Sequence, residues 1–335
     1  MALFPKVSVT AVHLVLVCAI ATAGITIHSK RSGTEATFSV ANPIPIPKYS
    51  LESSEDQVNN KKISGVIADS STVTFADVTI AISEICAPNN IVTGPNGAAM
   101  GCRTCPKGSV FQDEQSMHWD LKRALSGHFT SSDEENIILS VNGCEPHSMN
   151  FGGTFVFLRD NSKLKLLSYN GSLITERCHK LRSPDGRDFL VCQGEWGGQG
   201  SVASFIYQVV FDGKGASKTI PIFETSDSML TCGKDLRGKP DSPVQKSEIR
   251  TVQFKEHGSK LSGLSVSVTL GKKQLTQAEK VACVESVKNS NYQEASVSIP
   301  TKVYRIDFSY DGREFKIVPL SATTLKLFPK PELPK

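Results

Sequence analysis

Apolar residues recur at every second position in many short runs, mostly after residue 136. This alternation is typical of β-strands that bury one face in a core. The runs are rich in β-branched and aromatic residues, which favour strands. The sequence therefore predicts a mostly antiparallel all-β protein with strands at 137–141, 154–158, 164–169, 189–191, 204–211, 249–254, 264–270 and 303–310.

Dipeptides that favour tight turns separate several of these runs. They predict turns at Asn170-Gly171, Asp185-Gly186, Asp212-Gly213 and Asp311-Gly312. We expect no well-capped amphipathic helix of three or more turns in the second half of the chain.

The pattern is less regular before residue 126. Residues 63–68 and 73–85 have apolar side chains at roughly every second position, which predicts strands. The Gly-, Asn- and Pro-rich residues 88–100 predict a loop. The apolar positions of residues 111–125 fit a short helix or a strand equally well.

The most apolar segment lies at the N-terminus. Residues 7–27 contain no charged side chain and are long enough to cross a bilayer as a helix. Ala21-Thr22-Ala23 fits a signal peptidase site with cleavage before Gly24, but 21 residues are long for a removed signal. A signal peptide and a membrane anchor therefore both stay open. Either predicts export to the periplasm or the cell exterior, with the N-terminal segment in contact with the membrane.

Composition shifts suggest the domain organisation. Residues 1–27 are the signal or anchor, and the Pro- and Ser-rich residues 28–60 predict an extended linker. Residues 61–125 then form the N-terminal part of the β domain with a Cys-rich loop. Residues 126–322 form the main β region, and 323–335 form a tail.

Composition and charge narrow the classes of partner. Hydrophobic residues are 39% and charged residues 21% of the chain, which is typical of a globular protein. The formal net charge is +4, from 37 basic and 33 acidic residues, and no block of five like charges occurs. This balance does not favour a nucleic-acid partner.

Cysteine usage agrees with export. Of nine cysteines, Cys18 lies in the apolar segment, which leaves an even set of eight and predicts a disulfide framework. Cys178 and Cys192 are symmetric about the predicted turn at Asp185, so they should face each other across a hairpin and form a bridge. Proximity and elimination predict a second bridge, Cys232–Cys283. The other four cysteines would form two bridges between residues 86 and 144.

Two segments of the β region echo each other. The segment 207–213 (Tyr-Gln-Val-Val-Phe-Asp-Gly) is similar to the segment 304–312, which also places Tyr four residues before Phe and then ends in Asp-Gly. A looser third unit runs from Gly127-His-Phe to residues 152–157. Periodic β units of this size suggest propeller blades. A β-sandwich is the alternative.

Residues 127–140, with Gly127-His128-Phe129 before a polar loop and then Ile137-Ile-Leu-Ser140, resemble a degenerate blade of the FG-GAP or VCBS type. The resemblance covers residues 122–320 and implies a β-propeller. The calcium loop of those blades is absent, because residues 130–136 offer only Asp133, Glu134 and Glu135. Gly143-Cys-Glu-Pro-His147 and Asp185-Gly-Arg-Asp188 also resemble patterns in uncharacterised exported bacterial proteins, which implies no activity.

One cluster has the spacing of a metal site. Cys102-x-x-Cys105 and Cys144-x-x-His147 could supply four ligands to a tetrahedral zinc ion. Export favours disulfides at these cysteines instead. We therefore expect no cofactor, with zinc here and calcium in the blade loops as the alternatives.

Two polar segments are candidate ligand-binding sites. Glu145, His147 and Asn150 cluster beside a Gly-rich turn. Glu195, Trp196 and Gln199 lie in a Gly-rich segment, where an indole can stack on a sugar ring or a proline. Each could instead be an ordinary structural loop.

The sequence therefore favours a non-enzymatic binding protein or envelope scaffold whose partner is a protein or a glycan. The alternative is a hydrolase, metal-dependent or not, that uses Cys102, Cys105, Cys144 and His147.

Overall fold

The computed structural model describes residues 73–95, 97–146, 152–161, 163–198, 200–233, 242–257, 260–290 and 297–331. All the described residues belong to one compact unit. The expected signal or anchor and the linker lie outside the described residues. No described helix is long and apolar enough to cross a membrane.

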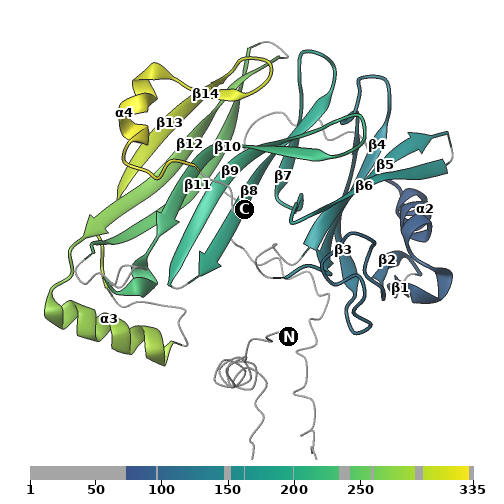
Figure 1. The fold of residues 1–335 in the computed structure, drawn as a ribbon. Helices are drawn as coiled ribbons and strands as arrows, with labels where there is room; N and C mark the ends of the chain where they lie inside the picture. The colour runs from purple at the N-terminus through teal and green to yellow at the C-terminus, as the bar shows by residue number, and fades with distance from the viewer. Residues whose placement is uncertain are drawn as a thin grey trace, which may run out of the picture. The chain divides into compact units, whose positions relative to one another are not determined.

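The described strands form three antiparallel sheets, in which strands adjacent in sequence are also adjacent in space (Figure 1). Sheet A contains β1 (Ile91–Thr93), β2 (Ala99–Cys102), β3 (Trp119–Gly127), β4 (Asn136–Gly143), β5 (Gly152–Asp160) and β6 (Lys163–Gly171). Sheet B contains β7 (Cys178–Arg182), β8 (Asp188–Gly198), β9 (Ser201–Phe211) and β10 (Ser217–Asp227). Sheet C contains β11 (Val244–His257), β12 (Lys260–Lys273), β13 (Lys302–Tyr310) and β14 (Phe315–Ile317).

The prediction of a mostly antiparallel β protein is confirmed, and all eight predicted runs fall inside observed strands. Three of the four predicted turns connect strands, at Asp185, Asp212 and Asp311. The fourth differs, because Asn170 and Gly171 are still part of β6. In the described part of the chain the sheets stack without closing into a barrel or a propeller.

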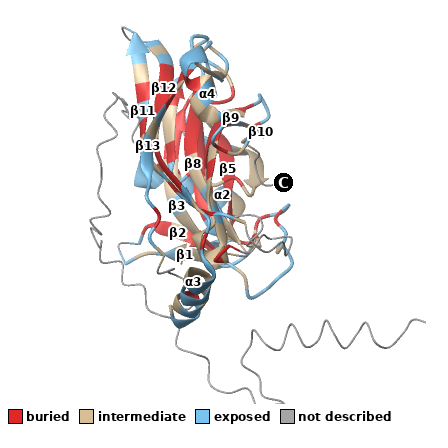
Figure 2. Cartoon of the chain, turned by 90° about the vertical axis from the view of Figure 1, so that its left-hand side faces the viewer, coloured by how far each residue is buried: buried red, intermediate tan, exposed pale blue. Residues whose placement is uncertain are grey.

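Sheet B is the middle layer of the stack, and its central strands are buried on both faces (Figure 2). Along β8, Leu190 and Cys192 pack in the core shared with sheet A, whereas Phe189 and Val191 pack in the core shared with sheet C. Successive side chains of a strand point to opposite faces, so one strand can serve both cores. On β9 the residues toward sheet A are Phe205, Tyr207, Val209 and Phe211.

The other face of sheet A carries a helix, where we had predicted a strand over residues 73–85. Helix α2 (Phe75–Ile85) begins with a capping box, in which Asp77 N donates to Thr74 Oγ1 at 3.2 Å and Thr74 N donates to Asp77 Oδ2 at 2.9 Å. Ala81 and Ile82 fill the core on this face. An ion pair of 2.9 Å between Asp77 and Arg159 of β5 attaches the helix to the sheet.

Two other expectations were also wrong. Residues 88–100 are not only a loop, because they contain the 3-10 turn Pro88–Asn90 and most of the β1–β2 hairpin. The second half of the chain has a 13-residue helix, α3 (Gln277–Asn289), with a capping box between Thr276 and Glu279. Only Cys283 and Val287 of α3 are buried, so its apolar pattern is weak.

The last described residues return to the core between sheets B and C. Helix α4 (Ala322–Leu325) is followed by Phe328, which is buried in the core between sheets B and C. The Phe328 ring packs edge-on against Phe223 and Tyr304, with centroids 5.2 and 6.1 Å apart. Part of the expected tail therefore belongs to the core.

Four disulfides join neighbouring elements. Cys178–Cys192 links directly opposite positions of β7 and β8, as the symmetry about Asp185 predicted. Cys232–Cys283 was also predicted, and it attaches the β10–β11 connection to α3. The remaining bridges are Cys86–Cys102 and Cys105–Cys144.

The importance of the core between sheets B and C can be tested on β12. Leu264 is fully buried there, so we expect Leu264→Ala to lower the free energy of unfolding by about 2–5 kcal/mol through lost burial and a residual cavity. Leu320→Ala is the matched control, because Leu320 is 92% exposed and its truncation should change this free energy by less than about 0.5 kcal/mol. Urea unfolding with the disulfides intact measures both. Equal effects would contradict the assignment of Leu264 to the core.

Candidate functional site

The cysteine cluster considered for zinc is a pair of disulfides in the structure. Cys102 is bonded to Cys86, and Cys105 is bonded to Cys144. Zinc binds thiolates, and a sulfur in a disulfide is not one, so this ligand set is not available. His147 lies outside the described residues, and among the described residues no group of three or more His, Cys, Asp or Glu side chains could hold a metal ion.

The Glu145 candidate site has a structural explanation. The Glu145 carboxylate is buried and accepts a hydrogen bond of 2.9 Å from the Tyr169 hydroxyl and one of 3.3 Å from Val110 N. Burial, followed by the charge of Glu145, raises the pKa of Tyr169, which keeps its hydroxyl a donor. Glu145 therefore connects the loop that contains Val110 to Tyr169 of β6. Asn150, like His147, lies outside the described residues.

Trp196 lies on a strand rather than in a Gly-rich loop. Strand β8 continues to Gly198, and Trp196 pairs with Ala203 of β9. The indole is 41% exposed and belongs to none of the buried clusters. Its Cη2 lies 3.5 Å from where a Cβ of Gly198 would be, which is ordinary van der Waals contact, so the ring lies over Gly198. Gln199 lies outside the described residues.

Trp196 borders a pocket of about 320 Å³, formed where the segment before β7 crosses this end of sheet B. The Tyr207 hydroxyl donates to Ile174 O at 3.2 Å and fixes one wall, and burial raises the pKa of Tyr207 to about 12. Glu195 and Arg177 form an exposed ion pair of 3.7 Å at the rim, which contributes little stability. The pocket thus brings together two of the predicted residues, Trp196 and Glu195.

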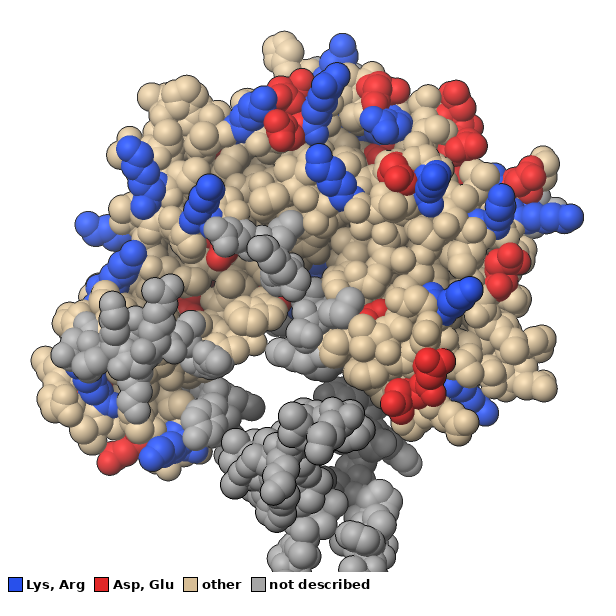
Figure 3. All heavy atoms as spheres, viewed as in Figure 1, with Lys and Arg blue, Asp and Glu red and all other residues tan. Residues whose placement is uncertain are grey.

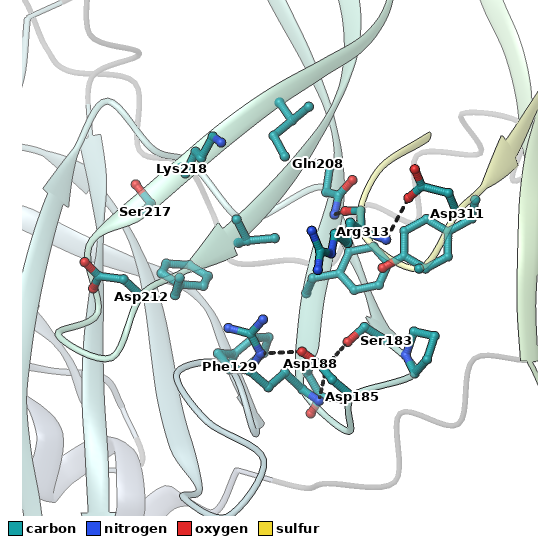
Figure 4. Close-up of a pocket in the computed structure, with 18 of the residues that line it drawn as sticks. Phe129, Ser183, Asp185, Asp188, Gln208, Asp212, Ser217, Lys218, Asp311 and Arg313 are labelled. Atoms are coloured by element: carbon teal, nitrogen blue, oxygen red, sulfur yellow. Dashed lines mark hydrogen bonds and ion pairs between the residues drawn. The ribbon is translucent and has the colours of Figure 1, made fainter. Parts of the chain in front are cut away.

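A larger cavity, of about 880 Å³, lies at the opposite end of β8. Its size falls within the range of about 300–1,000 Å³ that is usual for small-molecule sites. Three turns line it, and they are the predicted turns at Asp185, Asp212 and Asp311 (Figure 4). The two cavities share no lining residue, but their linings approach each other on β9, where Tyr207 lines the Trp196 pocket and the adjacent Gln208 lines the larger cavity.

The turns from sheets B and C touch at one edge of this cavity. Gly312 has φ +97°, and a Cβ there would lie 3.6 Å from Cγ of Pro184. Phe189 of β8 and Tyr310 of β13 stack beside this contact with ring centroids 5.2 Å apart. Burial, with a smaller effect of Asp185, raises the pKa of Tyr310 to about 12, so its hydroxyl is neutral at physiological pH.

A buried glutamine lines the inner wall of the cavity. Gln208 of β9 is only 1% exposed, and its Nε2 donates to Arg313 O at 2.7 Å. Because a carbonyl can only accept, this bond fixes the orientation of the amide. The Oε1 atom is then left buried and without a partner among the described residues. An unpaired buried acceptor is costly unless a ligand or water supplies a donor.

The carboxylates that line the cavity already have hydrogen-bond donors, three of them within their own turns. Asp185 accepts from the Ser183 hydroxyl, which with Arg187 lowers its pKa to about 2. Asp311 accepts from the backbone of Glu314, which with Lys316 lowers its pKa. Asp188 accepts a hydrogen bond from His128 N. Asp212 accepts hydrogen bonds from Lys214 N and Ala216 N.

Two of the cations that line the cavity are not paired in this way. The side chains of Arg313 and Lys218 form no ion pair or hydrogen bond with a described residue. Lys218 pairs with Val210 of β9 and therefore lies on the same face of sheet B as Gln208, two residues along the strand. Elsewhere, the face drawn in Figure 3 has Lys and Arg interspersed with Asp and Glu.

Sequence reasoning predicted the three turns but not the cavity that they form. Gln208 lies inside a predicted strand that was identified by its apolar pattern, and the structure buries it. A glutamine within that apolar run was the one feature of the sequence that could have pointed to this cavity.

Comparison with protein-family models finds no matching family, and comparison with curated proteins finds no match. The fold and the two cavities therefore provide the evidence on function.

The absence of a thiolate metal site can be tested chemically. We expect unreduced, denatured full-length protein to take up iodoacetamide only at Cys18, because the other eight cysteines are in disulfides. Peptide mass mapping before and after reduction measures this. Alkylation of Cys102, Cys105 and Cys144 without reduction, together with stoichiometric zinc in the native protein, would contradict the disulfide assignment.

Proposed function

We propose that this protein is an exported, non-catalytic binding protein that recognises a glycan through the Trp196 pocket. The observation that carries the proposal is the 41% exposed indole beside a pocket of about 320 Å³. The ring contributes to none of the buried clusters, and exposed aromatic rings are common in binding sites. Glu195 and Arg177 at the rim can hydrogen-bond to sugar hydroxyls.

Export is supported by the four disulfides, because such bridges form and persist in oxidising compartments. We infer a periplasmic or extracellular location, with residues 1–27 as the signal or the membrane anchor. The stacked sheets would then serve as a rigid scaffold that presents binding sites at their ends.

We also infer that sheets B and C are equivalent blade-like units. The echoed segments 207–213 and 304–312 support this, because they occupy β9 and β13, the third strand of each sheet. Each of these strands leads through its Asp-Gly turn into the fourth strand, β10 or β14. The relation to FG-GAP or VCBS blades is part of the same proposal.

The Trp196 proposal can be tested with neutral oligosaccharides, such as cello-, laminari- and chito-hexaose, by tryptophan fluorescence and calorimetry. We expect binding of at least one of them and a loss of about tenfold or more in affinity for Trp196→Ala. Stacking of a nucleobase on an aromatic ring is worth about 1–3 kcal/mol, and we expect a stacked sugar to lose a similar amount. Trp196→Phe, which keeps a ring, should retain most of the affinity.

The melting temperature provides the control. Both variants should melt within a few degrees of the wild-type protein, since the indole lies outside the buried clusters. A large loss of stability in Trp196→Ala would make Trp196 structural, and unchanged affinity would exclude it from the site.

A further inference from the structure

We infer that the cavity of about 880 Å³ is a second binding site, and that its ligand is a sugar acid, a hydroxylated sugar that carries a carboxylate. The inference does not depend on the Trp196 site, because the two cavities share no lining residue. It rests on three groups that face this cavity with unused hydrogen-bonding or charge capacity.

The first group is the Gln208 amide. Its Oε1 is buried and unpaired, so a ligand that fills the cavity must bring a hydrogen-bond donor to it. Sugar hydroxyls are such donors, and they can turn to suit the acceptor. A ligand with only acceptors, such as sulfate, would leave Oε1 unsatisfied.

The second group consists of the cations Arg313 and Lys218. Three of the four carboxylates that line the cavity are paired with cations, Asp185 with Arg187, Asp188 with Arg182 and Asp311 with Lys316. Arg313 and Lys218 therefore outnumber the one remaining carboxylate, Asp212, and leave an excess positive charge to meet a ligand. Arg313 lies directly beside Gln208, because its own carbonyl accepts from the Gln208 amide (Figure 4). A guanidinium binds a carboxylate with two parallel hydrogen bonds. The ligand should therefore carry its carboxylate close to a hydroxyl.

The third group is the aromatic wall. Tyr310 is half-buried, stacks on Phe189, and has a hydroxyl with no hydrogen bond to a described residue. A sugar ring has an apolar face and a polar edge, so it can contact the ring carbons of Tyr310 and bond to its hydroxyl. An acidic peptide would also bring carboxylates and donors, but it has no rigid ring to match this wall.

The test uses full-length protein and pairs of disaccharides that differ only in the carboxylate. Digalacturonate is compared with galactobiose of the same linkage, and glucuronate- and mannuronate-containing disaccharides are compared with their neutral counterparts. We expect at least one acidic disaccharide to bind about tenfold or more tightly than its neutral partner in calorimetry, since a charge-assisted hydrogen bond is worth about 1.5–3 kcal/mol.

Variants then assign the site. Arg313→Gln keeps the backbone carbonyl that holds Gln208 and should reduce acidic-sugar affinity about tenfold or more, and Lys218→Gln should also weaken it. Lys214→Gln is the matched control, because it removes the same charge from the Asp212 turn but Lys214 itself does not line the cavity. Gln208→Leu should also weaken binding of the acidic sugar.

Several results would overturn the inference. These are equal binding of acidic and neutral sugars, no binding of any acidic disaccharide at millimolar concentrations, or wild-type affinity in Arg313→Gln. Equal competition by sulfate or by an oligoglutamate peptide would reduce the cavity to a general anion site and so exclude a sugar acid. Failure of the Trp196 variants to affect neutral sugars would bear only on the first site.

Discussion

The structure depends on the burial of β8 and β9 on both faces. The apolar residues in the middle of these strands alternate between two cores, so the register of the strands is fixed twice, once against sheet A and once against sheet C. A slip of one residue would exchange Leu190 with Phe189 and Val191 and would mismatch both cores at the same time. Gly194 adds to this constraint, because a Cβ there would lie 2.4 Å from the Phe205 ring.

Both candidate sites follow from this double-sided packing. Where β8 and β9 extend beyond the neighbouring sheets, their faces are no longer covered by a core. At one end the segment before β7 partly covers the exposed face and leaves the Trp196 pocket. At the other end the Asp311 turn of sheet C approaches the Asp185 turn of sheet B, and the larger cavity remains between them. The middle of β8 and β9 is buried in the two cores and stabilises the fold, whereas residues toward the strand ends line the two candidate binding sites.

The sequence was a good guide to local structure wherever the period of two was clear. The eight predicted strands and the Cys178–Cys192 bridge depend only on alternation and turn symmetry, which are local properties. Helices α2 and α3 were not predicted. The apolar residues of α2 fit both the helical and the strand period, and α3 has few apolar residues. The capping boxes at Thr74 and Thr276 are nevertheless visible in the sequence. The larger cavity could not be predicted, since it exists only when three turns from two sheets meet. Gln208 Oε1 is unpaired for the same reason, because the amide is oriented by the carbonyl of Arg313 in the turn from sheet C.

The central claim is that β8 and β9 form the doubly buried middle layer of the stack. Native-state amide hydrogen exchange tests it most directly, because exchange in such strands requires the largest opening of the fold. The account predicts that amides of residues 189–192 and 205–209 exchange most slowly, more slowly than those of the edge strands β1 and β14. Exchange of the β8 and β9 amides at the rates of β1 and β14 would contradict it.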